Sequence, residues 1–385
     1  MRWAVAAAVG AAVAVAACSS SKGSTSAATT TSAAGPSTTT VNALAAAEAA
    51  TAKAEQGTYT NVDPTPRPAV KGKHIIIISS GQANISNLEP VMGAEEAAKA
   101  IGWQVEVYDA KLNPANDSPL IRQAIAAHAD GIILDAIDCD QAQQALEEAK
   151  AANIAIVPIY AFDCDDTEAG DEPTGLFSAN INYNGVDLDT FTEAYGAAQA
   201  QYIIAASHNT AKIIATQTPG FTVLYYTLKG FTDAIQASGG SKVLDTLQIS
   251  QADLLSGQLP SMIESELLRF PQATWIKSAY TYITTLGIGP ALQGKAGSID
   301  VMGGEGFEPE LDLIRSGIVT AVNAVSSEWT GWAAVDTMNS VFRHEPPAAS
   351  GIGWQIADKA HIPATGPLNP TVDFKAEYMK AWGLA

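Results

Sequence analysis

Positive charge is scarce in this chain of 385 residues. The sequence has 21 Lys and Arg residues against 40 Asp and Glu residues, so its net charge is −19 at pH 7. This balance argues against nucleic acid as a partner, because nucleic acid is bound by basic patches that neutralise phosphates. The acidic excess suits any exported protein and says nothing further about function.

Motifs of common enzyme classes are also missing. No serine stands in a GxSxG elbow, and no GxxxxGK[ST] phosphate loop occurs. The histidines are scattered, and none falls in a loop considered below as part of a site: His74, His128, His208, His344 and His361. We therefore expect a protein that is not an enzyme and that uses neither a cofactor nor a metal.

Only one hydrophobic run is long, and it opens the sequence. Arg2 precedes an apolar stretch over residues 3–17 that ends in VAAC. The stretch is too short for a permanent membrane-spanning helix, so it predicts a signal peptide over residues 1–17. The small residues before Cys18 resemble the lipobox of bacterial lipoproteins, which implies cleavage before Cys18 and lipid on its thiol. Plain secretion is the alternative.

The residues after Cys18 predict a tether. Residues 19–40 are mostly Ser, Thr and Ala, and such a tract buries too little apolar surface to fold. We expect a lipidated, disordered linker over residues 18–70, in which an Ala-rich helix of marginal stability over residues 41–56 is conceivable. The folded region is expected to begin near Lys71.

From His74 onward, short apolar runs alternate with helical stretches. The runs HIIIIS, WQVEVYDA, GIILDA, IAIVPIYAF and GLFSAN predict five strands, with helices over residues 88–101, 120–128 and 141–152. Continuous β-branched runs are typical of parallel strands covered on both faces. This series predicts a doubly wound α/β lobe with crossover helices.

A second series of the same rhythm follows a long connecting segment over residues 185–206. The runs AKIIATQT, SKVLDTLQI, TWIKSA, SIDVMGG and VTAVNAV predict strands, with helices over residues 222–237, 259–270, 282–293, 309–316 and 328–342. Two such series predict two Rossmann-like lobes. Ligands of open parallel sheets bind beyond the carboxyl ends of the strands.

The two cysteines other than Cys18 stand in matching positions. Cys139 follows Ile132 by seven residues, and Cys164 follows Val157 by seven. On neighbouring strands of one sheet they come within reach of a disulfide, which an exported protein keeps oxidised. The alternative is a pair of free or metal-binding thiols, but the absence of a nearby histidine in the sequence favours the disulfide.

Six segments follow one another in a characteristic order: VMGAEEAAKAIGWQVEVYDA, LIRQAIAAHADGIILDAID, IAIVPIYAFDCD, SANINYNG, KGFTDAI and VMGGEGFEPELDLIRSG. In this order they resemble the periplasmic-binding-protein type I family, the sugar-binding branch of solute-binding proteins for ABC importers. The resemblance implies a three-segment hinge near residues 180–183, 325–328 and 353–358, which permits closure around a ligand. It implies an N-terminal lobe of residues 71–181 plus 328–352, and a C-terminal lobe of residues 182–327 plus 353–385.

The resemblance also places a ligand-binding site in the loops after the strands. Sugars present hydroxyls and an apolar face, which carboxylates, amides and aromatic rings recognise. The implied ligand-binding residues are Ser80, Gln82, Asn84, Asp135, Asp138, Phe162, Asp163, Gln217, Phe221, Tyr280 and Glu305. Trp329 is a further aromatic candidate.

Two features depart from the family pattern. The segment SSGQANIS lacks an aromatic pair, and Cys164 follows Asp163 where family members often have arginine. A polyol, a nucleoside-like or a less polar ligand therefore stays open beside a sugar.

The resemblance implies a lipid-anchored monomer on the extracytoplasmic face of the bacterial cell membrane. Such a protein captures a sugar or polyol between its lobes and delivers it to ABC permease subunits. A ligand sensor of the same fold, acting on a membrane signalling partner, is the alternative.

Overall fold

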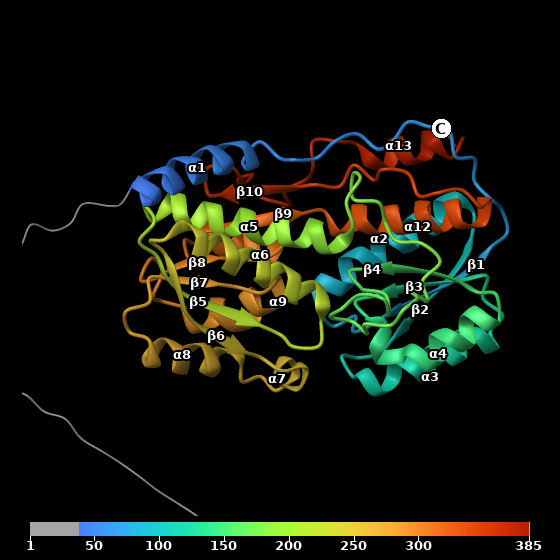
Figure 1. Cartoon of the computed structure of the whole chain (residues 1–385), viewed down its shortest axis with the longest axis horizontal. Coiled ribbons are helices and arrows are strands. Elements are labelled where there is room, and N and C mark those ends of the chain that lie inside the picture. Colours follow the sequence, from blue (N-terminus) through green and yellow to red (C-terminus); the bar gives the residue numbers. More distant parts are fainter. Residues whose placement is uncertain (1–37, 385) are drawn as a thin grey trace, which may run out of the picture. The chain divides into compact units, whose positions relative to one another are not determined.

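Two β-sheets organise residues 38–384, which the computed structural model describes (Figure 1). A four-stranded sheet forms the first lobe and a six-stranded sheet the second, which confirms the prediction of an α/β protein with two lobes. The predicted signal peptide and the lipidation site at Cys18 lie outside the described residues. Among the described helices, none is long and apolar enough to cross a membrane.

The first lobe has parallel strands in the order β2-β1-β3-β4. The strands are β1 (His74–Ser79), β2 (Gln104–Asp109), β3 (Gly131–Asp135) and β4 (Ala155–Ile159). The helices are α2 (Ile85–Ile101), η1 (Pro114–Asn116), α3 (Asp117–Ala126), α4 (Cys139–Ala151) and α12 (Ser327–Arg343). Because side chains alternate along a strand, Ile75 and Ile77 pack with α2 and α12, whereas Ile76 and Ile78 pack with α3 and α4.

The second lobe has the strand order β10-β9-β8-β7-β5-β6. The strands are β5 (Lys212–Gln217), β6 (Lys242–Gln248), β7 (Trp275–Lys277), β8 (Asp300–Met302), β9 (Ala321–Val325) and β10 (Trp354–Asp358). Strands β5 to β9 are parallel, and β10 pairs antiparallel with β9. The carboxyl ends of the parallel strands therefore lie along one edge of the sheet.

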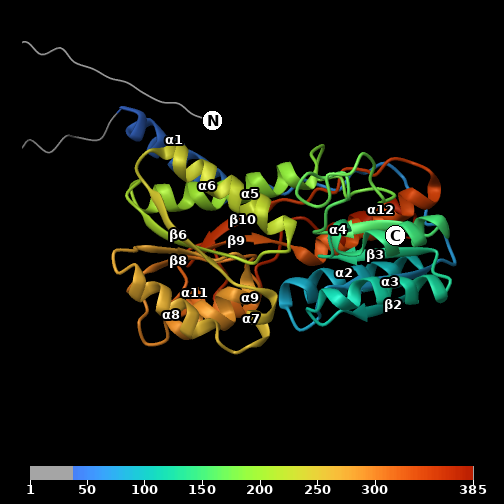
Figure 2. The same ribbon diagram turned by 60° about the horizontal axis from the view of Figure 1, so that its bottom comes forward.

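Helices cover both faces of the second sheet. Figure 2 shows α5 and α6 on one side and α8, α9 and α11 on the other. The helices of this lobe are α5 (Leu188–Ala206), α6 (Thr222–Ser238), α7 (Gln251–Leu255), α8 (Leu259–Arg269), α9 (Thr281–Ile283), η2 (Thr284–Ile288), α10 (Gly289–Ala291) and α11 (Glu308–Arg315). The helix predicted over residues 282–293 is present as a continuous helical segment, α9, η2 and α10, in which η2 is a π-helical turn.

The strand predicted from GLFSAN is wrong. The backbone N–H groups of Leu176 and Phe177 donate to the Asp163 carboxylate at 2.6 and 2.8 Å. Only Ser178 bonds to β4, through Ile156. A side chain therefore takes the donors that a ladder would need, and the first sheet ends at β4.

The disordered linker predicted over residues 18–70 is wrong for residues 38–70. Helix α1 (Thr38–Ala54) packs on α5 and buries Ala47 and Ala54. The strap that follows, residues 58–70, bonds to the segment before β10: Thr60 N donates to Gly351 O at 3.0 Å. Gly351 has φ +79°, and a Cβ there would lie 2.5 Å from that strap's Thr60 carbonyl. Composition does not predict this packing, because the strap is held mainly by hydrogen bonds of its own backbone.

The C-terminal segment also departs from the expected division. Strand β10 joins the second sheet, but α13 (Phe374–Ala381) packs on α12 of the first lobe. The Trp332 and Trp382 rings stack with centroids 5.4 Å apart. Residues 353–385 therefore do not belong wholly to the second lobe.

We predict that Arg67→Ala destabilises the protein strongly. Arg67 Nε lies 3.0 Å from Asp336 Oδ1, and both side chains are almost fully buried. Removing the cation leaves Asp336 buried without its charge partner, which typically costs about 3 to 5 kcal/mol. Chemical denaturation measures the loss in free energy of unfolding.

The matched control is Arg122→Ala, which breaks an exposed pair with Glu148 and should cost less than about 1 kcal/mol. Equal stability of the two variants would show that the strap is not part of the folded unit.

Candidate functional site

A cavity of about 90 Å3 lies between the carboxyl ends of the two sheets. A buried water needs at least about 10 to 15 Å3, so the cavity has room for a small solute. Five aromatic residues line it: Tyr160, Phe191, Tyr195, Phe221 and Tyr280. Its polar residues are Asn84, Ser86, Asn87, Thr192, Thr227 and Glu305, and its aliphatic residues are Ala136, Val223, Leu224, Ala279 and Val325.

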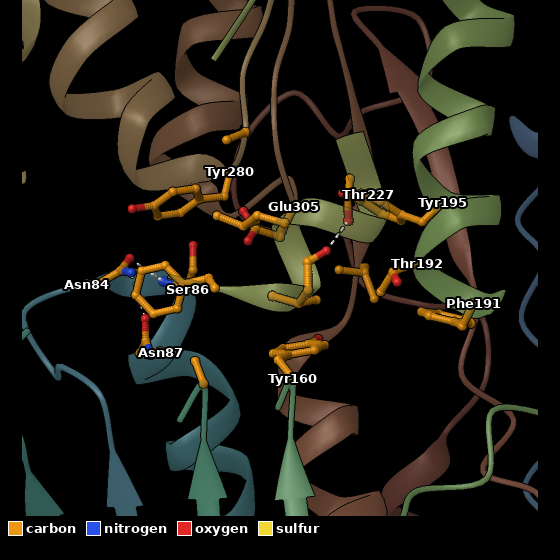
Figure 3. A pocket seen from close by; sticks show the side chains of 16 residues that line it. Asn84, Ser86, Asn87, Tyr160, Phe191, Thr192, Tyr195, Thr227, Tyr280 and Glu305 are labelled. Atoms are coloured by element: carbon orange, nitrogen blue, oxygen red, sulfur yellow. Dashed lines mark hydrogen bonds between the residues drawn. The ribbon is translucent and has the colours of Figure 1, made fainter. Parts of the chain in front are cut away.

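Both lobes contribute to these walls. In Figure 3, Asn84, Ser86, Asn87 and Tyr160 enter from the first lobe, while Tyr280 and Glu305 face them from the second. Phe191, Thr192 and Tyr195 of α5 close a further side. A ligand in this cavity would contact both lobes at once.

The amino end of α2 is fixed by a chain of buried amides. Asn84 caps the helix by accepting from Ser86 N at 3.0 Å, and its Nδ2 donates to Asn87 Oδ1 at 2.6 Å. Asn87 Nδ2 in turn donates to Ser80 Oγ at 2.6 Å and to Asp135 Oδ2 at 3.1 Å. Burial raises the pKa of Asp135 to about 7, against its hydrogen bonds from Ser79 and Asn87.

The loop after β8 presents Glu305 in a defined position. Glu305 Oε2 accepts from Thr281 N at 2.6 Å, and Glu305 N donates to Thr281 Oγ1 at 3.0 Å. The Glu310 carboxylate accepts from Gly304 N at 2.6 Å and from Gly306 N at 2.9 Å. These bonds hold both sides of Glu305, so its carboxylate can meet a ligand with little reorganisation.

Two tyrosine hydroxyls are anchored away from the cavity. The Tyr160 hydroxyl lies 3.2 Å from Ser327 Oγ and 3.0 Å from Thr330 Oγ1, and burial raises its pKa to about 12. The Tyr195 hydroxyl donates to Asn323 O at 2.6 Å, and burial raises its pKa as well. These tyrosines therefore offer the cavity their rings.

The lobes touch beside the cavity. Asp138 Oδ2 accepts from Thr222 N, the first residue of α6, at 2.8 Å, and Asp138 Oδ1 accepts from Phe162 N at 2.9 Å. Gln141 Nε2 donates to Gly220 O at 2.8 Å. Burial raises the pKa of Asp138 to about 6. The carboxylate thus joins a strand-end loop of one lobe to a helix of the other.

Four of the eleven predicted ligand-binding residues line the cavity: Asn84, Phe221, Tyr280 and Glu305. Asp135 and Gln217 are the last residues of β3 and β5, and Ser80, Gln82 and Asp138 lie in the loops after strands; none of these five lines the cavity. Phe162 and Asp163 line a separate cavity of about 280 Å3 together with Asp165, Asp166, Asp187 and Asp189. There the Asp163 carboxylate accepts the backbone N–H groups of Leu176 and Phe177, and it does not line the cavity between the sheets. Trp329 is fully buried in the core.

The sequence prediction missed most of the walls. Tyr160 follows Ile159, the last residue of β4, and has φ +51°. Phe191, Thr192 and Tyr195 lie on α5, within the segment interpreted as a connection. Their spacing of three and four residues on one helical face is a signal that was available, but it does not distinguish a cavity wall from the core.

The predicted disulfide is present. Cys139 and Cys164 are bonded, with their Cα atoms 5.0 Å apart. Closing this loop of 25 residues is worth roughly 3 to 4 kcal/mol on the chain-entropy model. The bond ties the amino end of α4 to the segment after β4, next to Asp138.

Residues 38–384 contain two groups that could supply metal ligands. One is Cys139, Cys164 and Asp163, whose sulfurs are joined in the disulfide. The other is Glu55, Asp358 and His361, where His361 Nδ1 lies 2.7 Å from Asp358 Oδ1. Neither group lines the cavity, so the site offers solute-binding groups rather than a metal centre.

Some of the buried polar atoms without a partner lie at the cleft. Within the described residues they include Ser86 Oγ and Tyr280 OH in the cavity wall, and Gln82 Nε2, Gln217 Oε1 and Thr218 Oγ1 in the adjoining loops. Buried polar groups in folded proteins are nearly always paired. A cluster of unpaired ones at a cavity indicates that a bound molecule completes them.

The fold and this cleft define the class of two-lobe solute-binding proteins. The periplasmic binding protein domain model matches residues 75–346, and the chain belongs to that family. It is a family of solute-binding proteins rather than enzymes. No curated protein sequence matches the chain.

Solved structures share the fold. A solute-binding protein of an ABC transporter from Agrobacterium vitis, bound with alpha-D-tagatopyranose, is 21% identical with a TM-score of 0.65, over 75% of this chain and 95% of that one. One from Burkholderia graminis in complex with D-arabinose is 18% identical with a TM-score of 0.63, over 76% and 98%. A second from Agrobacterium vitis with bound allitol is 15% identical with a TM-score of 0.60, over 75% and 96%.

We predict that Asp135→Asn flattens the dependence of stability on pH. The folded pKa of about 7 exceeds the unfolded value of about 3.9. The folded state therefore binds more protons between these values, and the free energy of unfolding falls as pH rises from about 4 to 7. At about 1.4 kcal/mol per pKa unit, the variant should gain up to a few kcal/mol at neutral pH and less at low pH.

Denaturation between about pH 5 and pH 8 measures this slope. Asparagine keeps an oxygen acceptor for Ser79 and Asn87. Asp233→Asn, at an exposed position, is the control and should leave the slope unchanged. An identical slope for Asp135→Asn would rule out this titration.

Proposed function

We propose that the protein is the lipid-anchored substrate-binding component of an ABC importer. It captures a small solute, a sugar or a polyol, in the cavity between its lobes and delivers it to permease subunits. The anchor is the lipidated Cys18 on the extracytoplasmic face of the cell membrane. The protein acts as a monomer without a cofactor.

The observation that carries this proposal is the cavity shared by both lobes. Rings from both lobes face polar groups, a combination that suits a solute with an apolar face and hydrogen-bonding edges. Ser86 Oγ and Tyr280 OH in the cavity wall have no hydrogen-bond partner among the described residues. Family members of this fold bound with tagatopyranose, arabinose and allitol support the solute class.

Closure around the solute is the motion that the proposal requires. Segments near residues 182–184 and 349–352 bond to one another beside the strap: Asn184 Nδ2 donates to Ile352 O at 2.9 Å, and Ser350 N donates to Asn182 O at 3.0 Å. Such short crossing segments can absorb hinge rotation. The bonds of Asp138 to α6 and of Gln141 to the loop before it would form when the lobes close.

We predict that Phe221→Ala weakens solute binding about tenfold. Phe221 is nearly buried and lines the cavity at the amino end of α6, and losing one ring contact of about 1.4 kcal/mol corresponds to that factor. A thermal-shift screen of sugars, polyols, deoxy sugars and amino sugars, with D-tagatose, D-arabinose and allitol among them, finds a binder, and calorimetry gives its affinity.

Phe270→Ala is the control, because Phe270 lies at a different cavity, beyond α8. It should leave affinity unchanged. A panel in which no sugar or polyol binds, or a binder indifferent to Phe221→Ala, would contradict the proposed site.

We predict that Cys18→Ser releases the protein from the membrane. Lipid on the Cys18 thiol is the proposed anchor, and serine cannot carry it. Fractionation of cells should find the native chain with membranes and the variant in the soluble extracytoplasmic fraction. Equal membrane association of both would exclude anchoring through Cys18.

A further inference from the structure

The side chains around the cavity have few hydrogen-bond donors left for a ligand. The hydroxyls of Thr192 and Thr227 each donate at 2.8 Å to a carbonyl one turn earlier in their helices. The Tyr195 hydroxyl donates to a backbone carbonyl at 2.6 Å. Both N–H bonds of the Asn87 amide are directed at Ser80 and Asp135.

The donors that remain are three. Ser86 Oγ and Tyr280 OH are buried without a partner in the described residues. The Asn84 amide donates one hydrogen to Asn87, which leaves its second. Figure 3 shows Asn84, Ser86 and Tyr280 gathered at one end of the cavity.

Acceptor capacity is concentrated in Glu305. It is the only charged residue in the cavity wall. Its Oε2 takes one backbone donor, from Thr281. Among residues 38–384, no Lys, Arg or His forms an ion pair with it, whereas other acidic residues do have such pairs. The cavity thus carries a negative charge without a bonded counter-ion.

Lys277 is the other candidate for a counter-ion to the Glu305 carboxylate. It is the last residue of β7 and is almost fully buried, and its Nζ lies 5.8 Å from the centroid of the Phe231 ring; it is not among the residues that line the cavity. Burial lowers the pKa of Lys277 to about 7, although the Glu305 charge acts to raise it. A lysine that loses its proton near neutral pH does not provide a permanent countercharge.

The aromatic rings of the cavity wall also favour a positively charged ligand. Tyr160, Phe191, Phe221 and Tyr280 line the cavity from four different segments of the chain. The faces of aromatic rings attract cations, and the attraction reaches about 2 kcal/mol when water is excluded. The same rings pack well against CH groups but offer little to hydroxyls.

We propose that the ligand is an amine-bearing sugar with few hydroxyls, an aminodeoxy sugar, whose ammonium group lies at the Glu305 carboxylate. The inference rests on the proposed function. Every hydroxyl of a sugar both donates and accepts, so a fully hydroxylated hexose would leave several oxygens buried without donors, and each such group costs free energy. An ammonium group only donates, and it meets the one strong acceptor. A sugar that lacks further hydroxyls presents more CH groups, and these pack well against the apolar rings.

The experiment is calorimetric titration of the purified protein with four matched compounds. They are a 3-amino-3,6-dideoxyhexose, its 6-deoxyhexose parent, the corresponding hexose and the corresponding hexuronate. We expect the amine to bind at least about tenfold more tightly than the 6-deoxyhexose, a difference of about 1.4 kcal/mol. The hexose should bind more weakly than the 6-deoxyhexose, and the hexuronate should bind most weakly of the four.

The Glu305→Gln variant removes the charge of Glu305 and keeps its shape, so it shows which of the two determines affinity for the amine. It should lower affinity for the amine about tenfold or more and change affinity for the 6-deoxyhexose little. Glu308→Gln is the control, since Glu308 is an exposed acid at the start of α11 and outside the cavity wall. The Glu308→Gln variant should change affinity neither for the amine nor for the 6-deoxyhexose.

The outcomes distinguish the two proposals. Tightest binding of the hexose or the hexuronate overturns the amine inference and leaves the solute-binding function standing. Equal loss of amine and 6-deoxyhexose affinity in Glu305→Gln also overturns the inference, because the residue would then act through shape. Failure of all four compounds to bind counts against both proposals.

Discussion

Buried carboxylates at the carboxyl ends of the strands hold the loops around the cavity. Asp135 anchors the side chains that fix α2, Asp138 joins the loop after β3 to α6, and Glu310 holds the glycine-rich loop after β8. Removing such a group from water is costly, and burial raises the pKa of all three. The chain bears this cost where strand ends must present ligand-binding groups in fixed positions.

The two lobes differ in what they offer a ligand. The first lobe supplies amide and hydroxyl groups from the amino end of α2, together with the Tyr160 ring. The second supplies the carboxylate of Glu305 and most of the rings. A ligand bound by only one lobe would lose half of these partners, so its free energy of binding is largest when the lobes are closed. This coupling is what makes a two-lobe protein a capture device.

The two-lobe fold could be predicted from the sequence because continuous apolar strands have a strong local signature. The site could be predicted only in part, since Asn84, Tyr280 and Glu305 lie in the loops after strands. Asp163 follows β4 just as closely, yet its carboxylate holds Leu176 and Phe177. Position after a strand cannot distinguish a ligand-binding carboxylate from a loop-holding one. The α5 residues and the packed strap depend on tertiary contacts that composition does not encode.

The most direct test of the account is a crystal structure of the protein with a solute that it binds. The account predicts electron density for the solute in the cavity between Tyr160 and Tyr280, within hydrogen-bonding distance of Glu305 and Ser86. Density instead in the acidic cavity beside Asp163 and Asp166, with an empty space between the sheets, would contradict it.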